Sequence, residues 1–230
     1  MKLVSFDVWN TLLDISVMLD ELAVSIAKIG GICIIDVVDG IMVTRNEVKR
    51  RRRNLEGDPD RALEESIELL ADILDVRPEV VRRATAMAVL NVEENIVIPG
   101  AEEALKGVKE MGMKVSVTGN VMFWPGSYTR LLLERFGLLR YVDATFFSDE
   151  VRAYKPMREM FEMPLREFDV KAEEAMHVGD TYAEDFEGAI NAGMWAAWIN
   201  PDAKEVRRRE ERGFEIPSVD RVVDVLKSIR

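Results

Sequence analysis

Hydrophobic positions along this chain fall either into short runs or into helical spacings. Short apolar or β-branched runs that end at a turn predict buried strands over Leu3 to Phe6, Lys114 to Val117, Ala144 to Phe147, Ala175 to Val178 and Trp195 to Ile199. Apolar residues spaced three or four apart predict helices over Ala101 to Met111, Tyr128 to Phe136, Arg158 to Phe168, Asp185 to Ala192 and Val219 to Ile229. Strands that alternate with helices indicate a parallel sheet with helices on both faces.

The segment between the first two strands has helical spacing almost throughout. It predicts helices from Val17 onward, from about Ile34 towards Arg53, over Arg61 to Leu74 and over Pro78 to Asn91. We therefore predict two domains, a core formed by residues 1–14 and 93–230 and a helical cap formed by residues 15–92. The expected fold class is α/β, with a Rossmann-like, doubly wound parallel sheet and an inserted α-helical cap domain.

Composition narrows the class of protein. A chain of 230 residues with 48% hydrophobic and 32% charged residues is typical of a globular protein. Its formal net charge of −11 argues against nucleic acid as a partner, and an anionic substrate would need a local cationic patch or a metal ion. The chain contains no glutamine but many Glu, Lys and Arg residues, a bias that suits a thermophile.

Targeting and redox signals are sparse. Asp7 comes too early for the apolar region of a signal peptide, and the most apolar stretch, Gly30 to Val43, is interrupted by Asp36 and Asp39 and is too short to cross a bilayer. The single Cys33 cannot form an intrachain disulfide, which suits a reducing compartment. We expect a cytoplasmic protein with no membrane partner; its oligomeric state cannot be inferred from these features.

Chemically useful side chains follow several predicted strands. Asp7 ends the first strand, Thr118-Gly119-Asn120 ends the second, Asp180 follows a later one, and Lys155 lies in a loop after another. Because ligands bind outside the carboxyl ends of parallel strands, we expect these groups to meet in one crevice. The group suits phosphoryl transfer: Mg²⁺ held by carboxylates would neutralise a phosphate, while Lys155, Thr118 and Gly119 would bind it. Asp7 could then attack phosphorus and form an aspartyl-phosphate that water cleaves.

Four motifs in this order resemble those of the haloacid dehalogenase superfamily. They are Asp7-Val8-Trp9-Asn10-Thr11-Leu12, Val117-Thr118-Gly119-Asn120, Lys155-Pro156, and His177-Val178-Gly179-Asp180 with Asp185. The resemblance extends over nearly the whole chain and implies a capped, Mg²⁺-dependent phosphatase acting on a phosphorylated small molecule. It implies Asp7 as the catalytic nucleophile, phosphate binding by Thr118, Gly119 and Lys155, and metal ligation by Asp7, the backbone carbonyl of Trp9, Asp180 and Asp185, the last directly or through water.

Trp9 departs from the pattern of the superfamily's phosphatases, which carry an acid–base Asp at this position. General acid–base assistance is typically worth about 10²–10⁴-fold in rate, and an indole cannot supply it. The enzyme could prefer leaving groups that need no proton, or another group could supply the proton. Two further hypotheses stay open: a metal-independent haloacid dehalogenase, which has an aromatic residue at this position, and a catalytically impaired protein that binds a phosphometabolite or a protein partner. The acidic pair Asp180 and Asp185 favours the metal-dependent phosphatase, because without a cation it would only repel an anionic substrate.

Four smaller expectations concern single side chains and the cap. Asn10 stands where the family usually has Gly, so we expect a left-handed backbone there. We expect His177 to be a buried, hydrogen-bonded imidazole with a structural role. Residues 17–92 should determine substrate choice, with Arg45, Lys49 and Arg50 as candidates for a cap-borne charge. The basic run from Lys49 to Arg53 is otherwise expected to be a solvated helix face.

Overall fold

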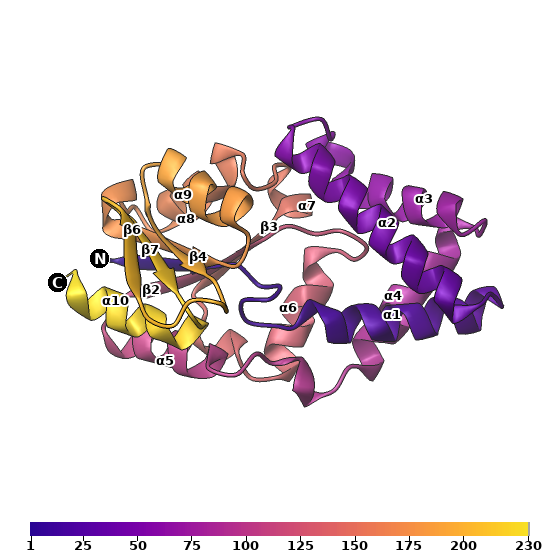
Figure 1. The fold of residues 1–230 in the computed structure, drawn as a ribbon, viewed down its shortest axis with the longest axis horizontal. Coiled ribbons are helices and arrows are strands. Elements are labelled where there is room, and N and C mark those ends of the chain that lie inside the picture. The colour runs from indigo at the N-terminus through magenta and orange to yellow at the C-terminus, as the bar shows by residue number, and fades with distance from the viewer. Residues whose placement is uncertain (230) are drawn as a thin grey trace.

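A seven-stranded sheet forms the centre of the protein, whose structure, a computed structural model, describes residues 1–229 (Figure 1). The strands are β1 (Leu3–Phe6), β2 (Lys114–Gly119), β3 (Ala144–Phe147), β4 (Ala175–Gly179), β5 (Trp195–Ile199), β6 (Arg207–Glu210) and β7 (Gly213–Ile216). Their order is β3-β2-β1-β4-β5-β7-β6, and every neighbouring pair is parallel except β6 with β7. The winding direction reverses between β1 and β4, which is where sheets of this kind bind ligands.

Helices cover both faces of the sheet, as the sequence predicted. Helices α5 (Ala101–Glu110) and α10 (Val222–Ser228) lie on one face, and α8 (Arg158–Glu167) and α9 (Glu187–Asn191) lie on the other (Figure 1). Along β1, Val4 and Phe6 enter the apolar cluster on one face, whereas Leu3 enters the cluster on the other. This alternation is the two-residue period of a strand buried on both faces.

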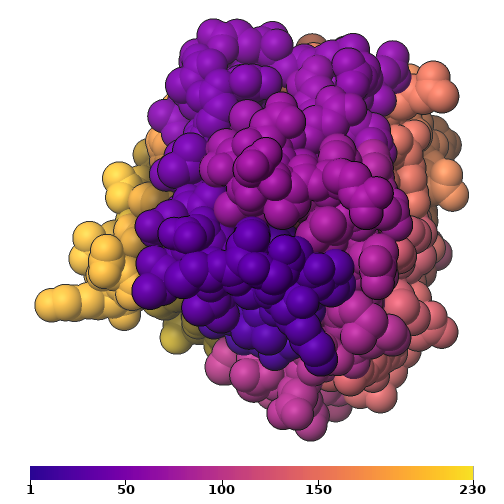
Figure 2. All heavy atoms as spheres, turned by 90° about the vertical axis from the view of Figure 1, so that its right-hand side faces the viewer, coloured from indigo at the N-terminus to yellow at the C-terminus, as the bar shows by residue number. Residues whose placement is uncertain are grey.

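Four helices are inserted between β1 and α5 and pack against one another. They are α1 (Ile15–Gly30), α2 (Ile34–Arg53), α3 (Ala62–Ile73) and α4 (Pro78–Asn91). Helix α1 begins where the Asp14 side chain accepts a 2.8 Å hydrogen bond from the Ser16 N–H, and it ends at Gly31, whose φ of 67° is left-handed. Figure 2 shows these helices as a continuous surface that closes one end of the molecule. Two shorter core helices, α6 (Gly126–Arg135) and α7 (Ser148–Val151), lie beside them.

The chain leaves the core and returns to it through a short two-stranded pairing. The Asp14 N–H donates to the Ile96 carbonyl at 2.7 Å, the Ile98 N–H donates to the Leu12 carbonyl at 3.0 Å, and Leu13 pairs antiparallel with Val97. The two crossings are therefore hydrogen-bonded to each other rather than being separate linkers.

The β6–β7 hairpin was not predicted from the sequence. Strand β6 carries exposed arginines, and an unbroken charged segment has no alternating apolar pattern. Instead the Arg208 guanidinium lies 5.9 Å from the centre of the Trp195 ring and 5.7 Å from that of Phe214. Phe214 and Ile216 of β7 are buried, so the sheet is extended by cation–π contacts on one strand and core packing on the other. Of the helices within residues 1–229, none has the length and apolarity needed to span a bilayer.

Candidate active site

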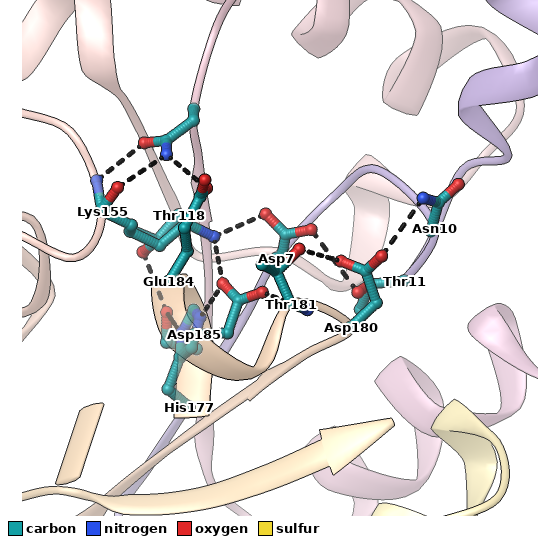
Figure 3. Close-up of polar contacts among 12 residues, drawn as sticks. Asp7, Asn10, Thr11, Thr118, Lys155, His177, Asp180, Thr181, Glu184 and Asp185 are labelled. Carbon is teal, nitrogen blue, oxygen red and sulfur yellow. Dashed lines mark hydrogen bonds and ion pairs between the residues drawn. The ribbon is translucent and has the colours of Figure 1, made fainter. Parts of the chain in front are cut away.

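Three carboxylates converge where β1 and β4 end. Asp7 directly follows β1, and its N–H donates to the Val178 carbonyl of the neighbouring strand at 2.8 Å. Asp180 directly follows β4, and Asp185 lies one turn farther along the chain. One oxygen from each of the three acids can be chosen so that all lie within 4.8 Å of one another. Figure 3 shows Asp7 between Lys155 on one side and Asp180 on the other.

Lys155 joins two of these acids. Its Nζ lies 2.5 Å from Asp7 Oδ1 and 2.6 Å from Asp185 Oδ1, and its side chain is 1% exposed. The loop after β3 therefore delivers an ammonium group into the crevice formed by β1 and β4. The sequence predicted that Asp7, Lys155, Asp180 and Asp185 would meet, and these four side chains are together in the structure.

Asp185 is the most firmly held of the acids. Besides Lys155, its Oδ1 lies 3.1 Å from His177 Nε2, and its Oδ2 accepts a 2.9 Å hydrogen bond from the Thr181 N–H. Gly179 makes room for this carboxylate, because a Cβ on Gly179 would lie 2.3 Å from Asp185 Cγ. Both oxygens of Asp185 are thus already engaged, which fits a role in orienting its neighbours as well as a role as ligand.

Burial raises the pKa of each of these acids, and the neighbouring charges decide whether the net shift is up or down. Burial raises the pKa of Asp7 to about 8, with Lys155 opposing the rise and the Asp185 and Asp180 charges adding to it. Burial also raises the pKa of Asp180, and the Asp185 charge adds to that rise. For Asp185 burial is outweighed by Lys155 and by the hydrogen bond from His177, so its pKa lies below the usual range. One ammonium group therefore does not balance the three acids.

The residues present suit a divalent cation. Carboxylate oxygens are the ligands that Mg²⁺ prefers, and opposite oxygens of an octahedral Mg²⁺ lie about 4.2 Å apart. The 4.8 Å spread of the three acids comes close to that figure, so small side-chain rotations would bring the oxygens to ligand distance. A cation would also supply the charge that Lys155 alone does not. The carboxylate ligands and the excess of negative charge therefore both favour a divalent-cation site.

Thr118 and Gly119 lie close to the acids but not on the pocket surface. Thr118 is fully buried, and its hydroxyl is 2.9 Å from that of Ser5 on the neighbouring strand. A Cβ on Gly119 would lie 3.3 Å from Val8 and Phe147 side-chain atoms, so this position is tightly packed. Within residues 1–229, neither Thr118 nor Gly119 lines the pocket that is bordered by Asp7, Trp9 and Asp180.

Asn120 and Glu184 also belong to the site, although neither was predicted to have a role there. The Asn120 amide donates to the Lys155 carbonyl at 3.0 Å and to Glu184 Oε2 at 2.9 Å, and its Oδ1 accepts from the Lys155 N–H at 2.8 Å. Asn120 thus fastens the Lys155 loop to the end of β2. Its place in the second motif was a usable signal, whereas nothing local distinguished Glu184 from a surface glutamate.

Two single-residue expectations are confirmed. Asn10 has a φ of 60°, in the left-handed region, and its amide donates to Asp180 Oδ2 at 3.1 Å. His177 is buried, with Nδ1 3.1 Å from the Ser5 hydroxyl and Nε2 3.1 Å from Asp185 Oδ1. Burial lowers the pKa of His177, which favours the neutral ring. Both nitrogens are satisfied, as expected for a structural imidazole.

A pocket of about 540 Å³, partly open to solvent, lies above the acids. One wall is aromatic: the rings of Trp9 and Trp124 meet edge to face with centroids 5.1 Å apart. Another wall comes from the inserted helix α2, which contributes Arg45, Lys49 and Arg52. The position expected to carry an acid–base carboxyl is thus occupied by an indole in contact with a second indole.

The expectation of a solvated basic face on α2 was wrong for Arg52 and agrees with the exposure of Arg50. Arg52 is 5% exposed and donates to the Val121 carbonyl of the core. Arg50, a candidate for a cap-borne charge, points outward and pairs with Glu47 and Glu56. The basic run winds around the helix, so its members face different surroundings.

The family model of the haloacid dehalogenase-like hydrolases matches residues 1–193, and the chain belongs to this family. The ribulose-1,5-bisphosphate 5-phosphatase of Halopiger xanaduensis is 31% identical over 136 residues, which are 59% of this chain and 56% of that protein. The glyceraldehyde 3-phosphate phosphatase of Methanothermobacter thermautotrophicus is 32% identical over 127 residues, 53% and 54% of the two chains. The chain spans about half the length of these curated relatives.

Solved structures share the fold across the whole chain. A haloacid dehalogenase-type phosphatase from Thermococcus onnurineus has a TM-score of 0.67 at 24% identity, covering 98% of both chains. The L-2-haloacid dehalogenase of Xanthobacter autotrophicus, with chloropropionic acid covalently bound, has a TM-score of 0.73 at 16% identity, covering 100% of both chains. Because a phosphatase and a dehalogenase share this fold, the fold by itself does not assign the reaction.

Proposed function

We propose that this hydrolase is a Mg²⁺-dependent phosphatase that cleaves a phosphorylated small molecule through an aspartyl-phosphate at Asp7. The observation that carries the proposal is the convergence of Asp7, Asp180 and Asp185 oxygens within 4.8 Å. Without a cation, the two additional acids would repel the carboxylate of a haloacid substrate, whereas a divalent cation would be bound by them. The curated relatives described above are phosphatases of small sugar phosphates, which supports the same reaction class.

Each residue has a proposed task. Asp7 attacks phosphorus, the bond from phosphorus to the ester oxygen breaks, and the leaving group departs. Lys155, 2.5 Å from Asp7 Oδ1, keeps this carboxylate oriented and offsets charge on the phosphoryl oxygens. Asp7, Asp180, the Trp9 backbone carbonyl and Asp185, the last directly or through water, would hold Mg²⁺. When bound, Mg²⁺ supplies positive charge that lowers the repulsion between the carboxylate and the phosphate. Water then cleaves the aspartyl-phosphate and restores Asp7.

Thr118 and Gly119 are proposed to bind phosphate together with Lys155. The support is their position at the end of β2, next to Asp7. The Thr118 hydroxyl is paired with that of Ser5, so a rotation about its Cα–Cβ bond would be needed before it could donate to a phosphate oxygen. We further propose that residues 15–92 act as the cap over a core of residues 1–14 and 93–230, and that the cap selects the leaving group.

Trp9 restricts the leaving groups that the enzyme can release. The indole lines the pocket where a proton donor would serve the departing oxygen, and it offers no acidic proton at neutral pH. We therefore propose a preference for leaving groups that depart without protonation, such as aryl or acyl phosphates, unless a group on the substrate supplies the proton.

One assay separates this proposal from its alternatives. Hydrolysis of p-nitrophenyl phosphate and halide release from a chlorinated short-chain acid are each measured with Mg²⁺ and with EDTA. Phosphatase activity that EDTA abolishes, and that Asp7→Asn removes while leaving the circular dichroism spectrum intact, is the expected result. Halide release that is unaffected by EDTA would instead establish the metal-independent dehalogenase. The aromatic side chain of Trp9 is what favours that alternative. Inactivity on both substrates together with Mg²⁺ binding would favour the impaired, phosphometabolite- or partner-binding protein.

A further inference from the structure

Three cationic side chains of helix α2 face the pocket above the acids. Arg45, Lys49 and Arg52 are spaced four and then three residues apart, which places them on one side of the helix. They belong to the inserted segment, whereas the acids belong to the strand ends of the core. The pocket thus has an acidic end supplied by the core and a cationic end supplied by α2.

The partners of these cations differ from those of their neighbours on the helix. Arg50 and Arg51 face outward, and each pairs with Glu47 at 2.7–2.8 Å. Within residues 1–229, neither Arg45 nor Lys49 has a carboxylate within 4.0 Å, and Arg45 Nε is buried without a hydrogen-bond acceptor. The outward Arg50 and Arg51 are therefore neutralised by an ion pair, whereas within residues 1–229 the inward Arg45 and Lys49 have none.

The acids across the pocket act on these cations only at a distance: Asp180 attracts Arg45 and Lys49 electrostatically, but among the described residues it forms no ion pair with either. Asp180 already accepts hydrogen bonds from Asn10 and Thr181, and Glu184 accepts one from Asn120. A buried guanidinium nitrogen that lacks an acceptor costs free energy, because its hydration is lost and nothing replaces it. Cationic side chains that line a pocket without an ion-pair partner form a cationic wall. Such a wall is expected where the ligand itself supplies the anion.

We propose that this wall binds a second anionic group of the substrate, on the leaving-group side, so that the substrates are phosphate monoesters carrying a further phosphate or carboxylate. The inference rests on the proposed phosphatase function and specifies its substrate class. The pocket that these cations line is partly open to solvent and also contains the three acids. Trp9 and Trp124 line the same pocket and offer an apolar surface to the carbon chain that joins the two anionic groups.

Charge explains why such a wall is needed. The chain has a formal net charge of −11, so an anionic metabolite is repelled at long range. Three cations on one side of the pocket offset part of this repulsion at short range, and their attraction is greatest for the substrate that carries the most negative charge. The same three residues therefore attract the phosphate ester and select substrates that carry a second anionic group.

The test compares substrates that differ only in the second anion. For a carboxylate, the pair is 3-phosphoglycerate against glycerol 3-phosphate; for a phosphate, it is propane-1,3-diol bisphosphate against the corresponding monophosphate. In the wild-type protein with Mg²⁺, we expect kcat/KM to favour the member with the second anion at least about tenfold in one or both pairs. The pair with the larger ratio identifies the anion.

A matched pair of variants assigns the effect to the wall. Lys49→Met should lower that ratio about ten- to hundredfold, the loss expected for one charge-assisted hydrogen bond. Arg50→Met removes the same charge from the outward side of the same helix and should leave the ratio unchanged. Calorimetric binding to the Asp7→Asn protein, which holds substrate without turning it over, should give the same order of affinities.

The outcomes distinguish the two proposals. If no phosphate ester is hydrolysed, the proposed function fails. If p-nitrophenyl phosphate is hydrolysed but both ratios are near one, the second-anion site is refuted while the phosphatase stands. A ratio that falls equally in Lys49→Met and Arg50→Met would also refute the site, because general surface charge would then explain the preference.

Discussion

Replacing Lys155 with methionine should destabilise the protein far more than an ordinary lysine substitution. In the wild-type protein its Nζ lies 2.5 Å from Asp7 and 2.6 Å from Asp185, and all three side chains are buried. Methionine fills a similar volume but leaves two carboxylates in a buried site without a cation. The substitution therefore tests whether these groups share one crevice.

The size of the effect follows from burial. Removing one partner of a buried ion pair costs about 3–5 kcal/mol, since the remaining charge is neither hydrated nor paired. For a chain of this size each kcal/mol shifts Tm by about 2–4 °C, so Lys155→Met should lower Tm by about 6–20 °C. The loss should be smaller in acid. Because Lys155 holds the pKa of Asp185 below its ordinary 3.8, the stabilisation it provides is complete above that value and disappears as the pH falls below it.

The measurement is thermal unfolding at pH 8 and pH 3 in EDTA, followed by circular dichroism. Lys106→Met is the control, because its Nζ lies 3.9 Å from Glu110 with 59% of the side chain exposed, and it should shift Tm by less than about 2 °C. Adding Mg²⁺ should restore part of the loss in Lys155→Met, since a divalent cation replaces the missing charge. A Tm for Lys155→Met within 2 °C of wild type at pH 8 would refute the convergence of these groups.

Three further predictions concern the same site. Gly179→Ala should weaken Mg²⁺ binding about 10–100-fold, because its Cβ would lie 2.3 Å from Asp185 Cγ and displace that carboxylate. Gly30→Ala is the control: its Cβ would have no neighbour closer than 3.5 Å, so the Kd for Mg²⁺ should be unchanged in the same titration. Because the pKa of Asp7 is raised to about 8, protons should compete with Mg²⁺ for this carboxylate. The affinity of the protein for Mg²⁺, measured by calorimetry, should therefore rise from pH 6 to pH 8, and it should not change over this range in Asp7→Asn. Trp9→Asp should raise kcat/KM for an alkyl phosphate more than for p-nitrophenyl phosphate; equal changes would mean that the missing acid does not limit turnover.

The sheet and the acid cluster were predictable because each rests on a local pattern. Leu3 to Phe6 is an apolar run that ends at Asp7, and Ala175 to Val178 is a second one that ends before Asp180. The order of the motifs, which resembles that of the family, then indicated that these two strand ends meet, and β1 and β4 are parallel neighbours in the sheet. Asn10 was predictable for a similar reason, since few non-glycine residues tolerate a left-handed backbone.

The features that could not be predicted depend on contacts between distant segments. Arg52 is indistinguishable in sequence from Arg50 and Arg51, yet it alone of the three is buried, because the packing of α2 against the core directs it toward Val121. Glu184 acquires its place through Asn120, 64 residues away in the chain. The same holds for β6, whose arginines are stabilised by aromatic rings on other strands.

The paired crossings at Leu13 and Val97 bear on how such a chain can change over evolutionary time. Because these residues pair as neighbouring strands do, the two ends of the inserted segment stand about 5 Å apart, a gap that a tight turn can bridge. An insertion of almost any length can therefore be gained, lost or exchanged at this point without moving the strand that carries Asp7.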